Sequence, residues 1–125
     1  MIGLQHTSQL TVTEAVTAIT MGSGDMPVLA TPAMMALMEN AAMLAVADHL
    51  PEGCTTVGGH IDASHFKPTP VGETVTATAV VTGVEGKKIE FRITAHCGDV
   101  LLGEGTHLRF VVDKEKFMSR LTRDK

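Results

Sequence analysis

The sequence predicts an α+β fold in which an antiparallel sheet wraps around one long central helix. Two patterns predict this arrangement: residues 32–49 are almost wholly apolar at helical length, and several Thr- and Val-rich alternating segments follow them. The length of 125 residues corresponds to one ordinary domain. We therefore expect a single domain over residues 1–125, in the order strand, helix, four strands, helix.

The first expected element is a strand at residues 7–17, because this segment alternates loosely and is rich in Thr and Val. A loop follows at residues 21–27, which contain Gly, Ser and Pro. The helix is expected to begin at Thr31-Pro32, with Thr as the N-cap and Pro at the first helical position. The segment at residues 50–53, Leu-Pro-Glu-Gly, ends it.

The central helix at residues 32–49 is apolar on nearly every side. Fourteen of its 18 residues are apolar, including six Ala and four Met. A helix of this kind is enclosed by other elements rather than laid on a surface. Because one sheet covers only one side of it, we expect a second copy of the chain to cover the other side. The sequence thus predicts a homodimer and leaves open whether dimers pair into a tetramer.

Four strands are expected after the helix, at residues 55–66, 73–84, 88–97 and 100–112. The first contains Gly58-Gly59, which indicates a β-bulge or a close backbone approach. The strand at residues 88–97 places its apolar side chains on one face: Ile89, Phe91, Ile93 and Ala95. A short amphipathic helix at residues 113–123 is expected to end the fold.

Composition and charge exclude several classes of protein. The hydrophobic share of 44% rules out intrinsic disorder, and a net charge of −4 with 3% aromatic residues argues against nucleic-acid binding. No apolar run reaches the roughly 20 residues of a membrane span, and the N-terminus lacks a signal-peptide pattern. The two cysteines lie outside any CxxC motif and fit a reducing compartment. We expect a cytoplasmic protein that binds neither nucleic acid nor membranes.

Glu39 is the first candidate for chemistry, because it lies in the middle of the apolar helix. Burying a carboxylate there is unfavourable unless the group is paired or protonated. An alternative interpretation is that Glu39 and Asn40 mark a narrow stripe of the helix that faces solvent. The sequence alone leaves both interpretations open.

His65 is the second candidate. Strand parity places it on the same face as Ile61 and Ala63, unless the glycine pair shifts the register. An inward histidine near a turn can be a general base, an orienting donor or a hydrogen-bonded core residue. His60, Asp62 and His65 also form an H-x-D-x-x-H string, but parity places the first two opposite His65, so we expect no metal site.

The chain also resembles a known family through short motifs in a fixed order. They are LATP at residues 29–32, ALME at residues 36–39, PTPVG at residues 68–72 just after His65, and GEGTH at residues 103–107. In this order and spacing they resemble the hotdog-fold acyl-CoA thioesterases, most closely the fluoroacetyl-CoA thioesterase group. The resemblance covers nearly the whole chain.

This resemblance implies a hydrolase for thioesters of coenzyme A, with a hotdog fold and active sites at a dimer interface. It also implies a catalytic set of Thr31, Glu39 and His65, and a substrate-binding glycine at Gly58. Glu39 would attack the thioester or activate water, and the Thr31 hydroxyl would serve either the site or the helix cap. No cofactor is implied, since coenzyme A is part of the substrate.

One departure from the family concerns the acyl group. Fluoroacetyl selectivity in the family depends on aromatic residues ahead of the catalytic Thr, and residues 24–29 contain none. A short or medium aliphatic acyl group is therefore as well supported as fluoroacetyl. Two other functions remain as alternatives: an enoyl-thioester hydratase or dehydratase, and an acyl-CoA-binding hotdog protein without turnover.

Overall fold

The computed structural model describes residues 1–122 of the chain. Its helices and strands are β1 (Gln5–Thr11), α1 (Ala18–Met21), α2 (Thr31–Val46), β2 (Cys54–His65), β3 (Thr74–Glu85), β4 (Lys88–Cys97), β5 (Val100–Asp113) and α3 (Lys114–Thr122). Two short 3-10 turns accompany them, at Glu14–Val16 and Ala47–His49. The last residue of the expected C-terminal helix, Arg123, lies outside the described residues.

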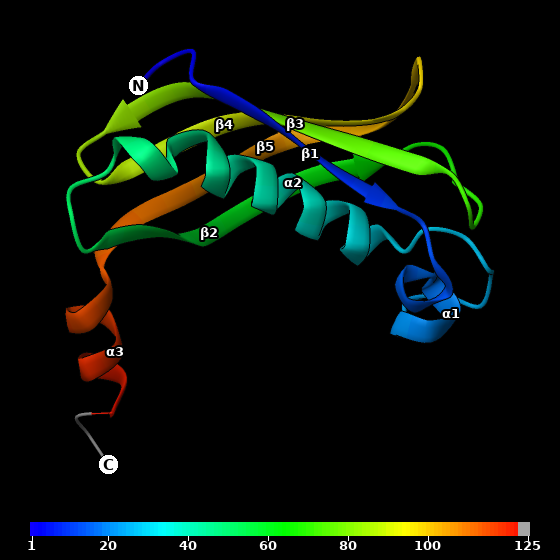
Figure 1. Cartoon of the computed structure of the whole chain (residues 1–125), viewed down its shortest axis with the longest axis horizontal. Coiled ribbons are helices and arrows are strands. Elements are labelled where there is room, and N and C mark those ends of the chain that lie inside the picture. The colour runs from blue at the N-terminus through cyan, green and yellow to red at the C-terminus, as the bar shows by residue number, and fades with distance from the viewer. Residues whose placement is uncertain (123–125) are drawn as a thin grey trace.

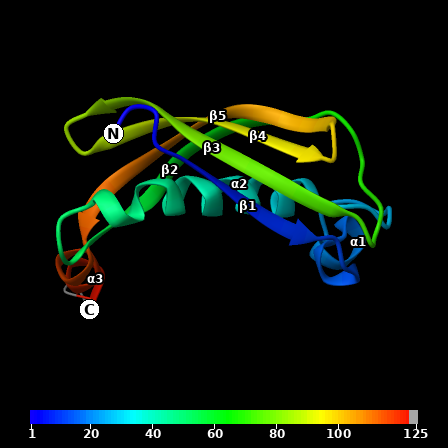
Figure 2. The same cartoon turned by 45° about the horizontal axis from the view of Figure 1, so that its top comes forward.

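The strands form one antiparallel sheet in the order β1-β3-β4-β5-β2. Figure 1 shows α2 lying across this sheet, with α1 near the beginning of α2 and α3 beyond the opposite end. In Figure 2 the sheet arches over α2. The predicted α+β class, with an antiparallel sheet around a central helix, is confirmed.

The core lies between α2 and the concave face of the sheet. The helix buries its small and flexible apolar residues: Ala33, Met34, Leu37, Met38, Ala41, Ala42, Ala45 and Val46. Against them pack alternate residues of β3 and β4, including the predicted apolar face of β4: Val75, Ala77, Ala79, Val81, Ile89, Phe91, Ile93 and Ala95. Because alanines are so frequent on both sides, the helix axis can lie close to the sheet.

The opposite side of α2 is not covered by the sheet. An exposed stripe runs along it at every fourth residue, through Pro32, Ala36, Asn40 and Leu44. Residues four apart lie on one face of a helix, so this stripe is the continuous uncovered side of an otherwise buried element. The expected second copy of the chain over this side stays a prediction.

The expected strand at residues 7–17 is wrong in its second half. β1 ends at Thr11, and the chain then forms the Glu14–Val16 turn and the short helix α1. The Thr17 hydroxyl donates to the Glu14 carbonyl oxygen at 2.8 Å and accepts from the Thr20 backbone N–H at 3.4 Å. These local bonds outweigh the β-propensity of Thr and Val, because a threonine side chain can replace strand pairing with a helix cap.

The bulge expected at the glycine pair is confirmed. Gly58 pairs with Arg109 and His60 with Leu108, so the register shifts by one residue and leaves Gly59 without a partner. A side chain at Gly59 would collide with the ring of Phe110. Before the bulge Thr56 faces inward, and after it the inward positions are odd-numbered and include His65.

Gly103 allows α2 and β2 to approach each other at the end that carries His65. It pairs with His65 across the strands. A methyl group on Gly103 would collide with the Ser64 carbonyl oxygen and would lie 2.9 Å from the Met34 sulfur. A glycine is therefore required where strand, strand and helix meet.

We predict that Gly103→Ala destabilises the protein by about 1–3 kcal/mol, because backbone and helix must move apart to admit one methyl group. Chemical denaturation monitored by circular dichroism measures this change. Gly24→Ala is the control, since its added methyl would meet only the Ala18 side chain, at 3.3 Å. Equal stability of the Gly103→Ala variant and the wild type would contradict the close approach.

Candidate active site

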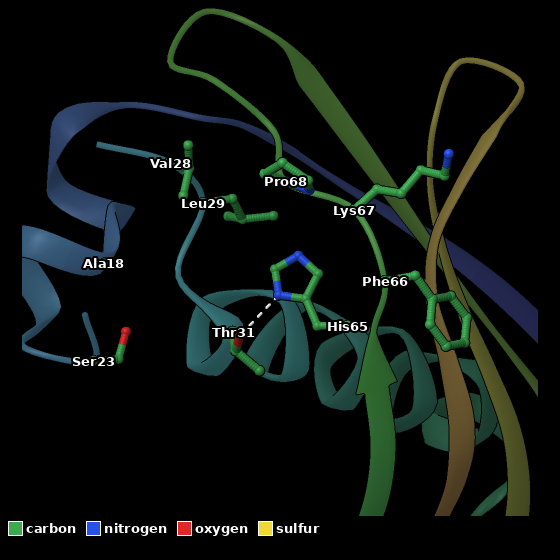
Figure 3. A pocket seen from close by; sticks show the side chains of 9 residues that line it. All are labelled: Ala18, Ser23, Val28, Leu29, Thr31, His65, Phe66, Lys67 and Pro68. Atoms are coloured by element: carbon green, nitrogen blue, oxygen red, sulfur yellow. Dashed lines mark hydrogen bonds between the residues drawn. The ribbon is translucent and has the colours of Figure 1, made fainter. Parts of the chain in front are cut away.

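Thr31 and His65 form a hydrogen-bonded pair at the beginning of α2. The Thr31 Oγ1 and the His65 Nδ1 lie 2.7 Å apart, as the dashed line in Figure 3 shows. The expectation that Thr31 is the N-cap is wrong: Ala30 holds that position, and no side chain caps the helix. Because Pro32 in the first turn lacks an N–H, one fewer backbone donor needs a cap, and the Thr31 hydroxyl bonds to the imidazole instead.

An open cavity of about 260 Å³ lies beside this pair. It is lined by Ala18, Ser23, Val28, Leu29, Thr31, His65, Phe66, Lys67 and Pro68. The wall that precedes Thr31 in the sequence carries small and aliphatic side chains only. In Figure 3 the ring of Phe66 points away from His65. The cavity thus has room for a small acyl group but no aromatic cover over it from residues 18–29.

The half-buried ring of His65 favours its neutral form. Desolvation lowers its pKa below the ordinary histidine value, and the nearby backbone of Lys67 opposes this only in part. The His65 Nε2 is buried and has no hydrogen-bond partner within residues 1–122. Buried polar atoms normally have partners, so this nitrogen is available to a bound group.

Glu39 lies in a second cluster, halfway along α2, with Gly58, His107 and Arg109. We call these four residues the carboxylate cluster. The Glu39 Oε2 lies 4.0 Å from the Arg109 Nη1. A methyl group on Gly58 would lie 2.9 Å from that same carboxylate oxygen, 3.5 Å from the His107 Cε1 and 3.6 Å from the Arg109 Nη1. Gly58 therefore leaves open a space that three polar side chains surround.

The two interpretations of Glu39 are each right in part. Its side chain is 42% exposed, so apolar walls do not enclose it. Neighbouring Asn40 is also exposed, and it accepts a hydrogen bond from the Ser8 hydroxyl at 2.7 Å. Yet Glu39 faces a cation that is itself buried, because the side chain of Arg109 is only 8% exposed. The carboxylate is thus both accessible and paired.

Arg109 is held by the strand next to its own. Its Nε donates to the Thr56 Oγ1 at 2.8 Å and its Nη2 to the Thr56 carbonyl oxygen at 2.9 Å. Desolvation lowers the pKa of the guanidinium, and the charge of Glu39 partly offsets this. An arginine stays protonated in such surroundings, so the cluster contains a fixed positive charge.

Neither Arg109 nor His107 is among the candidate residues that the sequence predicts. The available signal is their spacing. Residues 103, 105, 107 and 109 alternate along β5 and therefore share one face; two of them are glycines, and Arg109 pairs with Gly58. Long polar side chains opposite a glycine of a bulge indicate a functional site rather than a solvent-exposed edge of the sheet.

The Thr31–His65 pair and the carboxylate cluster are separate within one chain. Glu39 follows Thr31 by eight residues along α2, which is about 12 Å of helix. Within residues 1–122 the structure contains no group of three His, Cys, Asp or Glu suited to a metal ion. In particular, His60 and Asp62 are exposed on the face of β2 opposite His65. No helix of this part of the chain is long and apolar enough to cross a membrane.

Comparisons with known proteins cover most of the chain. The family model described as fluoroacetyl-CoA-specific thioesterase matches residues 12–115. The fluoroacetyl-CoA thioesterase of Streptantibioticus cattleyicolor is 42% identical over 94 residues, which are 75% of this chain and 68% of that protein.

Solved structures agree with this match. A structure of the fluoroacetyl-CoA thioesterase FlK superimposes with a TM-score of 0.92 at 33% identity, covering 100% of this chain and 97% of that one. A Thermus thermophilus protein described as a thioesterase superfamily member gives 0.90 at 26% identity, with 98% and 91% covered. A hot-dog-like protein from Thermanaerovibrio acidaminovorans gives 0.88 at 23% identity, with the same coverage, and supports the fold alone.

The expected hotdog fold is thereby confirmed. The similarity in sequence includes the Thr31–His65 pair and the carboxylate cluster, because the matched residues begin before Thr31 and end beyond Arg109. The chain belongs to the family of fluoroacetyl-CoA-specific thioesterases.

Proposed function

We propose that this protein hydrolyses coenzyme A thioesters of short or medium acyl groups, with Thr31, Glu39 and His65 as catalytic residues and Gly58 as a substrate-binding residue. Family membership supports thioester hydrolysis, so the chain is an acyl-CoA thioesterase. The observation that carries the residue assignment is the approach of the Glu39 carboxylate to the open space at Gly58. A carboxylate, an imidazole and a cation meet there at an accessible position.

The arrangement suits hydrolysis of a thioester. Glu39 can take a proton from water while the water oxygen bonds to the carbonyl carbon. Alternatively, it can attack that carbon itself and form a mixed anhydride, which water then hydrolyses. The backbone N–H at Gly58 can donate to the oxyanion that forms. When the C–S bond breaks, the thiolate takes up the proton that the attacking water loses, and the His65 ring, oriented by Thr31, can relay it. The products are a carboxylic acid and the thiol of coenzyme A.

A complete site of this kind needs two chains. β2 is an edge strand of the sheet, and an unpaired edge readily pairs with another strand. If two β2 edges pair antiparallel about a two-fold axis between Ile61 and Asp62, Gly58 lies opposite the partner's His65, because both are equally far from that axis. We propose a homodimer of this form, in which the carboxylate cluster of one protomer completes the Thr31–His65 pair of the other.

The acyl group is proposed from the cavity beside His65. The part of its wall that precedes Thr31 in the sequence consists of small and aliphatic side chains, among them Ala18, Val28 and Leu29. Such a wall suits an aliphatic acyl chain and gives no aromatic contact specific to fluoroacetate. The hydratase and the non-catalytic alternatives are not favoured, since family membership points to hydrolysis.

We predict thiol release from a panel of acyl-CoA substrates, with acetyl, butyryl or hexanoyl esters cleaved at least as fast as fluoroacetyl. Glu39→Gln should lower kcat by about 10²–10⁴-fold, because the amide can neither accept a proton from water nor attack the thioester. Glu52→Gln, at an exposed turn, is the control. Equal rates in wild type and Glu39→Gln would remove Glu39 from the mechanism, and tight binding without release would favour the non-catalytic alternative.

We predict that mixing two inactive variants restores activity. If each site takes Thr31 and His65 from one protomer and Glu39 from the other, a dimer of Thr31→Ala with Glu39→Gln has one intact site. Random exchange, by refolding the two proteins together, should then give about a quarter of wild-type activity. A mixture that remains inactive, or a monomer in light scattering at micromolar concentration, would contradict the shared site.

We predict that the free energy of unfolding decreases as the pH falls below about 6.5, the ordinary histidine pKa. The unfolded chain then binds protons that His65, with its lowered pKa, does not bind in the folded state. Urea denaturation at pH 7.5 and pH 5.5 measures the difference. His65→Asn should reduce it without abolishing it, because the pKa of His107 is lowered too; the exposed His49→Asn is the control. An unchanged difference in His65→Asn would contradict this.

A further inference from the structure

His107 is a buried histidine to which the proposed mechanism gives no role. It is 1% exposed, on the same face of β5 as Arg109. Both of its ring nitrogens have partners: the Nδ1 lies 2.6 Å from the His60 carbonyl oxygen, and the Nε2 lies 3.3 Å from the Arg109 Nη1. The fully bonded imidazole of His107 thus connects Arg109 to the bulge of β2.

The partners of His107 determine which nitrogen carries the proton. A carbonyl oxygen only accepts hydrogen bonds, and a guanidinium only donates them. The Nδ1 must therefore donate to His60, and the Nε2 must accept from Arg109 with its lone pair. The ring is neutral and held in one tautomer.

The surroundings of His107 favour this neutral ring. Desolvation is the largest effect and lowers its pKa, while the hydrogen bond to the His60 carbonyl raises it. The charged and titratable groups that face it are Arg109 on its own strand, Glu39 on α2 and His60 on β2. Of these, Glu39 raises the pKa of His107, and the other two lower it.

The hydrogen bonds of Arg109 restrict its guanidinium to one orientation. Thr56 accepts from its Nε and Nη2, and His107 accepts from its Nη1. The Nη1 carries two hydrogens, so one remains for Glu39 at 4.0 Å. Loss of the His107 acceptor would free this end of the guanidinium, which is the end that faces the carboxylate.

His107 also holds the backbone around Gly58. His60 is the residue at which strand pairing resumes after the bulge, and its carbonyl accepts from the His107 ring. A methyl group on Gly58 would lie 3.5 Å from the His107 Cε1. One imidazole thus braces both the bulge and the cation on either side of the space at Gly58.

We propose that His107 is a positioning residue of the thioesterase site, which directs Arg109 toward Glu39 and fixes the bulge around Gly58 without touching the substrate. This inference rests on the proposed role of Glu39. In this proposal, residues of β5 position the catalytic groups that lie on α2 and β2.

Two substitutions separate the two bonds of His107. In His107→Asn the amide nitrogen replaces the Nδ1 and keeps the donor to His60, but nothing replaces the acceptor for Arg109. In His107→Gln the amide oxygen reaches the position of the Nε2 and keeps that acceptor. We expect His107→Asn to lower kcat by about 10²-fold, the effect of a small misplacement at a reacting centre, with little change in KM. His107→Gln loses only the bond to His60 and keeps the acceptor for Arg109, so it should lose less of kcat than His107→Asn does. Half-buried His96→Leu on β4 is the control.

Coupling to Arg109 is the second measurement. In an Arg109→Met background, His107→Asn should cause no further loss of kcat, because its effect passes through the guanidinium. Losses that multiply independently, or a His107→Gln variant as impaired as His107→Asn at equal thermal stability, would overturn the proposal.

The tautomer gives a test that needs no turnover. Nitrogen-15 spectra of the histidine rings at pH 7, with the His107 signals identified by their absence in His107→Gln, should show the proton on the Nδ1. A proton on the Nε2 would overturn the positioning role even in an active enzyme. A wild type that cleaves no acyl-CoA would instead refute the proposed function, whatever the tautomer.

Discussion

The bulge at Gly58-Gly59 is the constraint on which the polar groups of β2 and β5 depend. One extra residue in β2 turns Thr56 inward on one side and His65 inward on the other. Without it, strand parity would send one of these two side chains to the outer face. The same irregularity exposes backbone beside the Glu39 carboxylate. Because Gly59 is unpaired, Thr56 can hold Arg109 on the inner face while His65 also faces inward at the far end of the strand.

The small residues of α2 and β5 serve this arrangement. Alanines on the helix and glycines on β5 let the helix lie close to the sheet, so that short side chains such as Thr31 reach across to β2. A helix packed with larger side chains would lie farther from the strands. The scarcity of aromatic residues in this chain is therefore a condition of the geometry as well as a property of the core.

Much of the fold follows from the sequence because its signals are local. The helix at residues 32–49, the strand pattern of β4 and the bulge glycines each depend on periodicity or on a residue type with few alternative uses. The misplaced N-terminal strand shows the limit, since the Thr17 side chain forms a cap that β-propensity does not reveal. Thr31, Glu39, His65 and Gly58 follow from the family resemblance, whereas Arg109 and His107 depend on cross-strand register, which a single segment does not contain.

The burial of Arg109 within a single chain has a consequence for whatever group covers Glu39. The water around its guanidinium is removed while the chain folds, with Thr56 and His107 in its place. A surface that later covers Glu39 therefore dehydrates a carboxylate whose counter-charge is already fixed nearby. Covering a lone carboxylate would be far less favourable. Folding alone thus fixes the positive charge of the site. A group that later covers the site has only the Glu39 carboxylate left to dehydrate.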